Sequence, residues 1–236
     1  MENKIITTGA LLVVTDYNFL PLDIRESWIP RYTDNYLIYD RYHRFEESEN
    51  IKHQQNVGAN IYDIFYHILN HYDNLPEILI FCKGNVIPRH CGEEKFKNII
   101  NNRKFTTIEN YIRESSRYST GVYAYVDEFD GYHENPIEVD NTVRGIHHSR
   151  YIFTYEEMLN SIFENPTFSE YIRFAPGGNH IITRKDILRY NKTFYEDMVK
   201  YVGWDVKPGE AYILERAMFT LYNNEFKIRD RYINNI

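Results

Sequence analysis

The sequence predicts an α/β fold: a mostly parallel central sheet flanked by helices, in a single domain over residues 1–236. Three short apolar runs, at 10–15, 36–39 and 77–82, have the composition of strands buried on both faces. Between the second and third runs, apolar residues recur at three- and four-residue intervals as far as Tyr72, the pattern of an amphipathic helix. Strands and a helix in this order are typical of a sheet with parallel members.

Polar residues follow the first two predicted strands. Asp16 and Asn18 come after the first strand, and Asp40 begins a polar loop that is expected to extend to Asn56, the candidate N-cap of the helix. Because open α/β sheets bind ligands beyond the carboxyl ends of their strands, Asp16, Asn18 and Asp40 are candidate ligand contacts. The alternative stays open that they only form turns, which use the same residue types. Asn56 and Gly58 also suit a phosphate-facing helix start, although capping explains them equally well.

The third strand leads into a loop with three side chains that can carry positive charge. Lys83, Gly84 and Asn85 follow the apolar run, and Arg89 and His90 come next. Positive charge at a strand end predicts contact with an anionic ligand such as a phosphate group. The competing interpretation is a solvated surface charge for Lys83 and an ordinary hydrogen-bonding loop residue for His90.

A second candidate site lies in the C-terminal third. Gly177, Gly178 and Asn179 precede a short strand, and a glycine pair lets the backbone turn sharply or approach a ligand closely. Thr183, three residues before Asp186, then predicts a helix start, with core-facing apolar residues over 187–199. A last helix has an apolar stripe that consists of Ile213, Leu214, Ala217, Met218 and Leu221.

Glu215 and Arg216 lie off this stripe, so both are expected to face a cleft. A carboxylate in such a position suits a general base, and the alternative is a salt-bridged helix surface. Two further pairs, Thr106 with Glu109 and Thr154 with Glu157, have the spacing of capping boxes and predict helices at 107–115 and 155–164. A strand-like run at 121–126 lies between them.

Composition narrows the functional class. A net charge of −7, from 27 basic and 34 acidic residues, gives no general attraction to nucleic acid. No apolar run approaches the length of a membrane span, about 18 residues, and no secretory signal is recognisable, so a soluble, cytoplasmic protein is expected. Cys82 and Cys91 match no common zinc or redox motif and are expected to be reduced and packed.

An acidic, histidine-containing region follows the 121–126 run. Its spacing matches no recognised metal signature, so no metal ligand is assigned, and an acidic loop is the preferred interpretation. The residues concerned are Asp127, Glu128, Asp130, His133, His147 and His148.

Four blocks of the sequence resemble a glycosyltransferase-like family found in microbes, fungi and viruses. They are VVTDYN at 13–18, the segment 56–90, the segment 174–202 and ILERAMFTLYN at 213–223, whereas residues 92–170 match least. The resemblance implies a glycosyltransferase-A-like fold, in which the first strand's end holds a nucleotide-sugar donor. It also implies that the glycine-rich strand and the acidic helix face a glycan, glycoprotein or other hydroxyl-bearing acceptor.

The resemblance assigns a role to each candidate residue. The donor-side residues are Asp16, Asn18, Asp40, Lys83, Gly84, Asn85, Arg89 and His90, and the acceptor-side residues are Gly177, Gly178, Asn179 and Arg216, with Glu215 as catalytic base. Many such enzymes have an Asp-x-Asp metal motif where this chain has Cys82-Lys83-Gly84-Asn85. Metal-independent transfer is therefore expected, with cations at the diphosphate, while manganese or magnesium remains open as a cofactor.

Two other functional classes stay open. A non-catalytic nucleotide- or sugar-binding module would use the same cleft without consuming its ligand. A phosphodiesterase or nuclease would need a convergent metal cluster, which the dispersed acidic and histidine residues do not establish.

Overall fold

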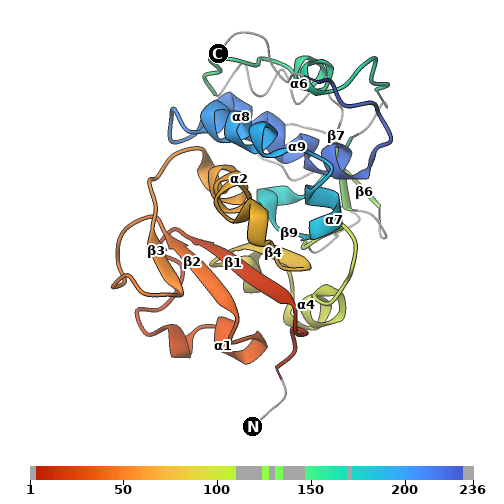
Figure 1. The fold of residues 1–236 in the computed structure, drawn as a ribbon. Coiled ribbons are helices and arrows are strands. Elements are labelled where there is room, and N and C mark those ends of the chain that lie inside the picture. The colour runs from red at the N-terminus through yellow and green to blue at the C-terminus, as the bar shows by residue number, and fades with distance from the viewer. Residues whose placement is uncertain (1–3, 110–123, 128–130, 135–146, 169–171, 231–236) are drawn as a thin grey trace.

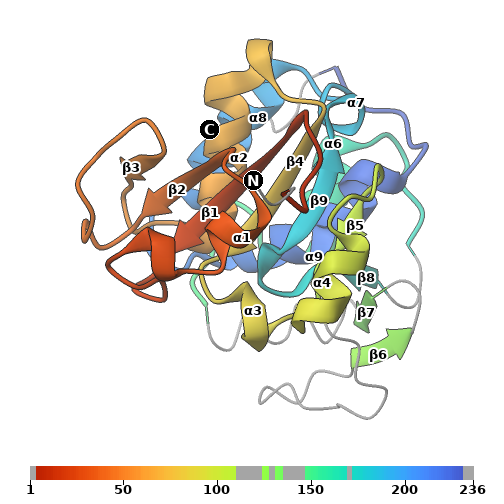
Figure 2. The same cartoon turned by 90° about the horizontal axis from the view of Figure 1, so that it is seen from below.

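The structure is a computed structural model that describes residues 4–109, 124–127, 131–134, 147–168 and 172–230. Its centre is a six-stranded sheet with the order β3-β2-β1-β4-β9-β5, which can be followed in Figure 2. The strands are β1 (Ala10–Asp16), β2 (Tyr36–Asp40), β3 (Ile51–His53), β4 (Ile78–Lys83), β5 (Thr106–Thr107) and β9 (His180–Thr183). Strands β3, β2, β1 and β4 are parallel, whereas β9 is antiparallel to both β4 and β5. The α/β prediction is confirmed, with a mixed sheet.

Helices cover both faces of this sheet. In Figure 1, α2 lies on one face with α8 and α9 beyond it, and α1 and α4 lie on the other. Successive side chains of β1 point to opposite faces of the sheet. Val13 therefore packs into the core beneath α2, whereas Leu12 and Val14 pack on the other face. The helices are α1 (Ile29–Tyr32), α2 (Ala59–His71), α3 (Val86–Arg89), α4 (Glu93–Ile99), α6 (Tyr155–Ile162), α7 (Arg184–Ile187), α8 (Lys192–Val202) and α9 (Gly209–Asn223), with short 3-10 turns at Ile24–Glu26, Tyr72–Asn74 and Pro176–Gly178.

The three strands predicted from apolar runs are confirmed to within one residue at either end. The polar segment after Asp40, which was expected as a loop, contains the short strand β3 at the sheet edge. Its composition gave no strand signal because it is exposed or half-buried, so pairing with β2 and not burial defines it. Cys82 and Cys91 are free and buried, as predicted.

Helix α2 begins later than predicted, because its N-cap is Gly58 and not Asn56. The buried Arg41 side chain explains the difference. Its guanidinium donates to the carbonyl oxygens of Gln55 and Val57, which precede the helix, and to that of Ala59, the first residue of α2. The Asp63 carboxylate pairs with the same guanidinium at 2.8 Å and accepts a hydrogen bond from Thr15. A tertiary ion pair therefore decides the start of the helix.

The C-terminal helices bury the predicted stripe. Thr183 caps α7 by accepting from the Asp186 amide, as expected, but the helix ends at Ile187 and a separate helix, α8, follows. In α9 every residue of the predicted apolar stripe is fully buried. Four accessible residues of α9 recur every three or four positions along one face of the helix, Tyr212, Glu215, Phe219 and Asn223, and Thr220 lies beside them.

A second, three-stranded sheet with the order β6-β7-β8 lies beside α9 (Figure 2). Its strands are β6 (Ala124–Asp127), β7 (Gly131–Glu134) and β8 (Ile172–Phe174), so the predicted strand at 121–126 is found in part. The capping box of Thr154 and Glu157 is confirmed at the start of α6. The capping box predicted at Thr106 is wrong, because Thr106 and Thr107 pair with β9; most of the helix expected there lies outside the described residues.

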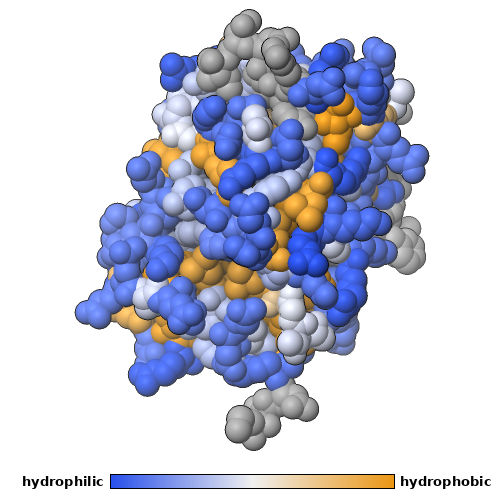
Figure 3. Space-filling view, in the orientation of Figure 1, coloured by the Kyte–Doolittle hydropathy of each residue, from blue (hydrophilic) through white to orange (hydrophobic). Residues whose placement is uncertain are grey.

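Within the described part of the chain, no helix is long and apolar enough to cross a membrane. The face in Figure 3 is largely hydrophilic, with hydrophobic residues in smaller patches among the charged ones.

Candidate functional site

Three segments that are distant in sequence meet at the end of β4: the β4–α3 loop, the turn at Pro176–Gly178 and the accessible face of α9. Gly177 has a left-handed backbone, with φ of +68°. A Cβ at Gly177 would lie 3.1 Å from Lys83 Nζ and 3.1 Å from His90 Cε1. Two of the three basic side chains of the predicted donor loop, Lys83 and His90, therefore reach the glycine turn of the predicted acceptor side, and the glycine leaves room for them.

Lys83 is the central cation of this cluster. Its ammonium forms no hydrogen bond or ion pair with any residue that the structure describes. Burial lowers the pKa of Lys83, and the carboxylate of Glu215 opposes that effect by raising the pKa. Glu215 on α9 is thus within electrostatic reach of the β4 strand end. An ammonium without a protein partner, held in a partly buried position, suits an anionic ligand.

Glu215 is held by its neighbour on α9. The Arg216 guanidinium donates to Glu215 Oε1 at 2.9 Å. That guanidinium lies over the Tyr212 ring, 3.4 Å from its centroid, and over the Phe174 ring at 4.7 Å, and it is almost entirely buried. Arg216 was predicted to contact the acceptor directly. The structure shows it fixing the position of the half-buried Glu215, so direct contact with a ligand stays a prediction.

His90 has an acidic partner that the sequence did not reveal. Its Nδ1 lies 2.8 Å from Glu109 Oε2, and Glu109 is 7% exposed. A carboxylate at Nδ1 orients the imidazole and leaves Nε2 as the second ring nitrogen for a ligand. Glu109 drew notice in the sequence only as part of a capping box, and no local signal connects it with a histidine 19 residues earlier.

His147 extends the cluster on the α9 side. Burial lowers its pKa, a hydrogen bond with the backbone of Lys207 raises it, and the nearby charges of Arg216, Lys207 and Glu215 also act on it. His147 appeared in the sequence only as a member of an acidic loop. Lys83 and His90 thus lie beside Gly177, Glu109 pairs with His90, and the charges of Glu215 and Lys207 act on both Lys83 and His147.

Gly178 and Asn179 support the turn from within. Asn179 is fully buried; its Oδ1 accepts from the Lys83 amide at 2.8 Å, and its Nδ2 donates to the Pro176 oxygen at 2.9 Å. The buried Gly178 packs against the Asn60 side chain, whose amide donates to the Gly177 oxygen. Both residues were assigned to the acceptor, and the geometry gives them the role of fixing Gly177 beside Lys83.

Replacing Gly178 with Ala is expected to destabilise the fold by about 2–4 kcal/mol. The residue has φ of +66°, and a Cβ would lie 2.6 Å from Asn60 Nδ2. Gly9→Ala is the matched control, since Gly9 also has a positive φ but a Cβ there would meet nothing closer than 3.6 Å. Urea unfolding gives the free energy of unfolding of both variants and so separates the steric clash at Gly178 from the strain of a positive φ. Equal losses of unfolding free energy would show that the contact with Asn60 has no energetic importance.

The carboxylates at the ends of β1 and β2 are used by their own loops. Asp16 is fully buried and accepts from the amides of Asn18, Phe19 and Leu20. Asp40 is also fully buried and accepts from the amides of Tyr42, Arg44 and Phe45. The turn interpretation thus accounts for both residues, and their contact with a ligand stays a prediction. Asn18 is exposed, and its Oδ1 accepts from Arg44.

Gly84 is required for close packing at the same edge. A Cβ on Gly84 would lie 2.6 Å from Asp16 Oδ1, and the Gly84 oxygen accepts from the Trp28 indole at 2.8 Å. Asn85 differs, because its Oδ1 is buried without a hydrogen-bond partner in the described part of the chain. Arg89 is exposed beside the cluster. Asn85 and Arg89 are therefore better placed for a ligand than Gly84 is.

The described strand-end residues do not fit a divalent metal. Asp16 and Asp40 turn their carboxylates to backbone amides, and across the described residues no three His, Cys, Asp or Glu side chains gather into a possible metal site. Glu128 and Asp130 lie outside the described residues.

A family model described as "Protein of unknown function (DUF3431)" matches residues 23–227. The chain belongs to the DUF3431 family. This match includes the β4 end, the glycine turn and the accessible face of α9, so the whole cluster lies within the family's shared region. No curated protein and no solved structure matches the chain.

Proposed function

We propose that this DUF3431 protein is a glycosyltransferase that moves a sugar from a nucleotide-sugar to a hydroxyl-bearing acceptor such as a glycan. The observation that carries the proposal is the Lys83 ammonium beside Gly177 at the end of β4, which has no partner among the described residues and lies within electrostatic reach of Glu215 on α9. The Lys83 ammonium can stabilise the negative charge that develops on a leaving diphosphate, and the Glu215 carboxylate can accept the proton of an attacking hydroxyl. The two are held on different elements, which leaves room for two substrates to meet.

The proposed transfer uses these groups as follows. The acceptor oxygen forms a bond to the anomeric carbon and passes its proton to Glu215. The bond from that carbon to the diphosphate oxygen breaks, and its electron pair stays on the diphosphate. Lys83 stabilises the added negative charge, supported by Arg89 and by His90 in its pair with Glu109. Arg216 acts through Glu215 as a positioning residue.

The sheet topology supports this arrangement. Four parallel strands end at one edge, where the resemblance to glycosyltransferase-A-like proteins puts the donor, and the antiparallel strand β9 follows the glycine turn on the acceptor side. In the proposal, Lys83 takes the place of the metal at the diphosphate. Transfer is then expected to be equal in excess chelator and in added Mn²⁺ or Mg²⁺. Absolute dependence on the metal would contradict this part of the proposal.

Substitution of Glu215 by Gln is expected to reduce transfer by at least about 10²-fold, because it removes the proton acceptor and keeps the shape. Donor binding is expected to change little, since Lys83 and its loop remain. The measurement is a coupled assay of nucleoside-diphosphate release, together with a thermal-shift titration of the donor. Glu225→Gln is the matched control, because Glu225 is an exposed glutamate just beyond α9.

A non-catalytic binding module is the alternative, and the unpartnered Lys83 would serve it equally well. Thermal-shift screening with nucleotides and nucleotide-sugars identifies a donor, and incubation with that donor and a panel of glycans then measures its consumption. Stable retention of the donor, with no nucleoside diphosphate formed and with binding unaffected by Glu215→Gln, would favour the module.

A further inference from the structure

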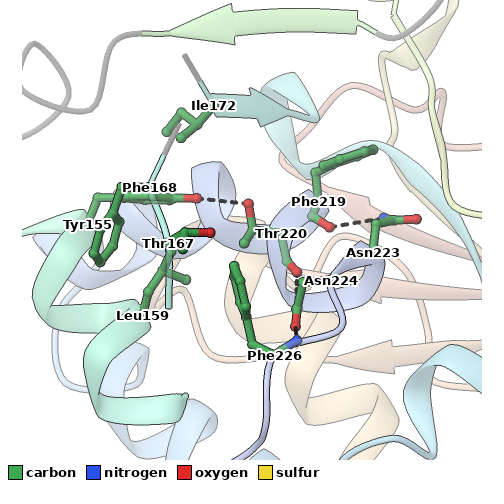
Figure 4. A pocket seen from close by; sticks show the side chains of 10 residues that line it. All are labelled: Tyr155, Leu159, Thr167, Phe168, Ile172, Phe219, Thr220, Asn223, Asn224 and Phe226. Atoms are coloured by element: carbon green, nitrogen blue, oxygen red, sulfur yellow. Dashed lines mark hydrogen bonds between the residues drawn. The ribbon is translucent and has the colours of Figure 1, made fainter. Parts of the chain in front are cut away.

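A separate pocket lies farther along α9, between this helix, α6 and β8. It has a volume of about 270 Å³, and Figure 4 shows its lining. The residues that line it are Tyr155, Leu159, Thr167, Phe168, Ile172, Phe219, Thr220, Asn223, Asn224 and Phe226. None of them belongs to the cluster around Gly177, and none is charged. The pocket is therefore separate from that cluster, and its lining favours an uncharged ligand.

Aromatic rings form much of this pocket, and most are held in place by other residues. Phe219 packs edge-on to Phe105, with ring centroids 5.7 Å apart, and the Arg173 guanidinium covers it at 5.3 Å. Phe226 packs against Phe163 at 5.5 Å. Phe168 is 42% exposed and stands at the rim. Rings that are fixed before binding offer flat apolar surfaces at low entropic cost.

Hydroxyl and amide groups are interspersed with the rings. The hydroxyls of Tyr155 and Thr220 lie 2.8 Å apart, and either can be the donor, so the half-buried Thr220 is fixed with a hydroxyl oxygen that can also accept from a ligand. Asn223 donates to the Phe219 oxygen at 3.0 Å, which leaves its exposed Oδ1 as an acceptor. Asn224 has its oxygen engaged by the Phe226 amide, and so it shapes the pocket.

We infer that this pocket binds one ring of a neutral carbohydrate. A pyranose presents C–H bonds on its faces, which pack on aromatic rings, and hydroxyls at its edge, which pair with neutral hydroxyl and amide groups. The volume lies near the lower end for ligand pockets, about 300–1,000 Å³, and suits a single ring. A purely apolar ligand would make no hydrogen bond with the exposed Asn223 Oδ1 or with the Thr220 hydroxyl oxygen.

The position of the pocket links it to the proposed transferase site. Glu215, Phe219 and Asn223 lie on the same face of α9, and eight residues of helix rise about 12 Å. A short oligosaccharide could then present one hydroxyl to Glu215 while a distal ring occupies the pocket. Only this link rests on the proposed function; recognition of a sugar ring rests on the pocket itself.

The test is an NMR titration of the full-length protein, without any donor, using the methyl glycosides of glucose, galactose, mannose and N-acetylglucosamine, with indole as an apolar probe. At least one glycoside is expected to shift the signals of Thr220, Asn223 and Phe226 and to leave those of Lys83 and Gly177 unchanged. Phe168→Ala and Asn223→Ala are each expected to weaken that binding about tenfold.

Two controls match these variants. Leu188→Ala removes an exposed apolar side chain elsewhere (Leu188 is 47% exposed), and Asn70→Ala removes an asparagine that donates to the carbonyl four residues earlier, as Asn223 does. Both controls are expected to bind as the wild type does. Binding of indole but of no glycoside, glycoside shifts confined to the Gly177 cluster, or full binding in both pocket variants would each overturn the inference. Since no donor is present, none of these outcomes depends on transferase activity.

Discussion

Replacement of Lys83 by Met is expected to reduce the proposed glycosyl transfer by about 10²- to 10³-fold, because it removes the cation that we propose stabilises the leaving diphosphate. Methionine keeps most of the apolar stem, so packing beside Gly177 is retained. The Lys83 amide hydrogen bond to Asn179 is made by the backbone and survives the change. Nucleoside-diphosphate affinity, measured by calorimetry, is expected to fall with the rate, since the same ammonium contacts ground state and product.

The fold is not expected to suffer from this change. The Lys83 ammonium has no described partner to lose, and burial already disfavours its charge, as the lowered pKa shows. Lys185→Met is the control, because Lys185 is an exposed lysine on α7. Normal diphosphate affinity in Lys83→Met, with an unchanged melting temperature, would remove Lys83 from the site and with it the main support for the proposed function.

The free energy of unfolding is expected to fall by about 4 kcal/mol between pH 7 and pH 4, an order-of-magnitude figure. Two buried histidines cause the loss. Burial lowers the pKa of His67 from 6.5 to about 3 and that of His180 from 6.5 to about 4. In the unfolded chain both bind a proton near pH 6.5, whereas in the fold they stay neutral until much lower pH. Stability is therefore complete above pH 6.5 and is lost as the pH falls toward 4.

Asp63 acts in the opposite direction. Burial raises its pKa from 3.8 to about 6, even beside Arg41, so the folded state takes up this proton first and gains stability as the pH falls below 6. Each histidine contributes a loss of about 3 kcal/mol by pH 4, and Asp63 offsets about 2 kcal/mol of the sum. The histidines therefore determine the sign of the net effect.

The His180→Phe variant isolates one of these contributions. His180 stacks on Phe105 and lies near Phe81, so a phenyl ring suits the space, although the hydrogen bond to the Gly178 oxygen is lost. The variant is expected to be less stable at pH 7 but to lose about 3 kcal/mol less between pH 7 and pH 4. His43→Phe, at an exposed histidine, is the control. Chemical denaturation across this pH range gives the result, and an unchanged pH dependence would contradict the assignment.

Local sequence patterns correctly predicted the strands and helices whose apolar residues are buried in the fold. The apolar runs of β1, β2 and β4 are strands because both faces of the sheet are covered, and the α9 stripe is buried as its spacing requires. The same patterns failed where another segment competes for the backbone. Thr106 has the spacing of a helix cap, yet the ladder with β9 takes its backbone groups, and Arg41 takes the carbonyls that would begin α2.

The candidate site was likewise predictable from the sequence only in part. Lys83, His90, Gly177 and Glu215 were predicted as separate residues, because a cation after a buried strand, a glycine pair and a glutamate off an apolar stripe are visible in sequence. That the Gly177 and Glu215 side faces the Lys83 loop was predicted, but the close approach of the Lys83 and His90 side chains to Gly177 was not visible in the sequence. It depends on β9 inserting beside β4, which brings Gly177 within reach of a lysine 94 positions earlier.

By itself, the sequence determined the α/β class, the main helices and strands, and the residue types available for chemistry, because these follow from burial periodicity and turn composition. Only the tertiary structure decided which polar groups remain free. Asp16 and Asp40 have the residue type of ligands but are occupied by backbone amides, whereas Lys83 is left without a described partner. That distinction depends on where each buried hydrogen bond goes, and those bonds join residues far apart in the chain.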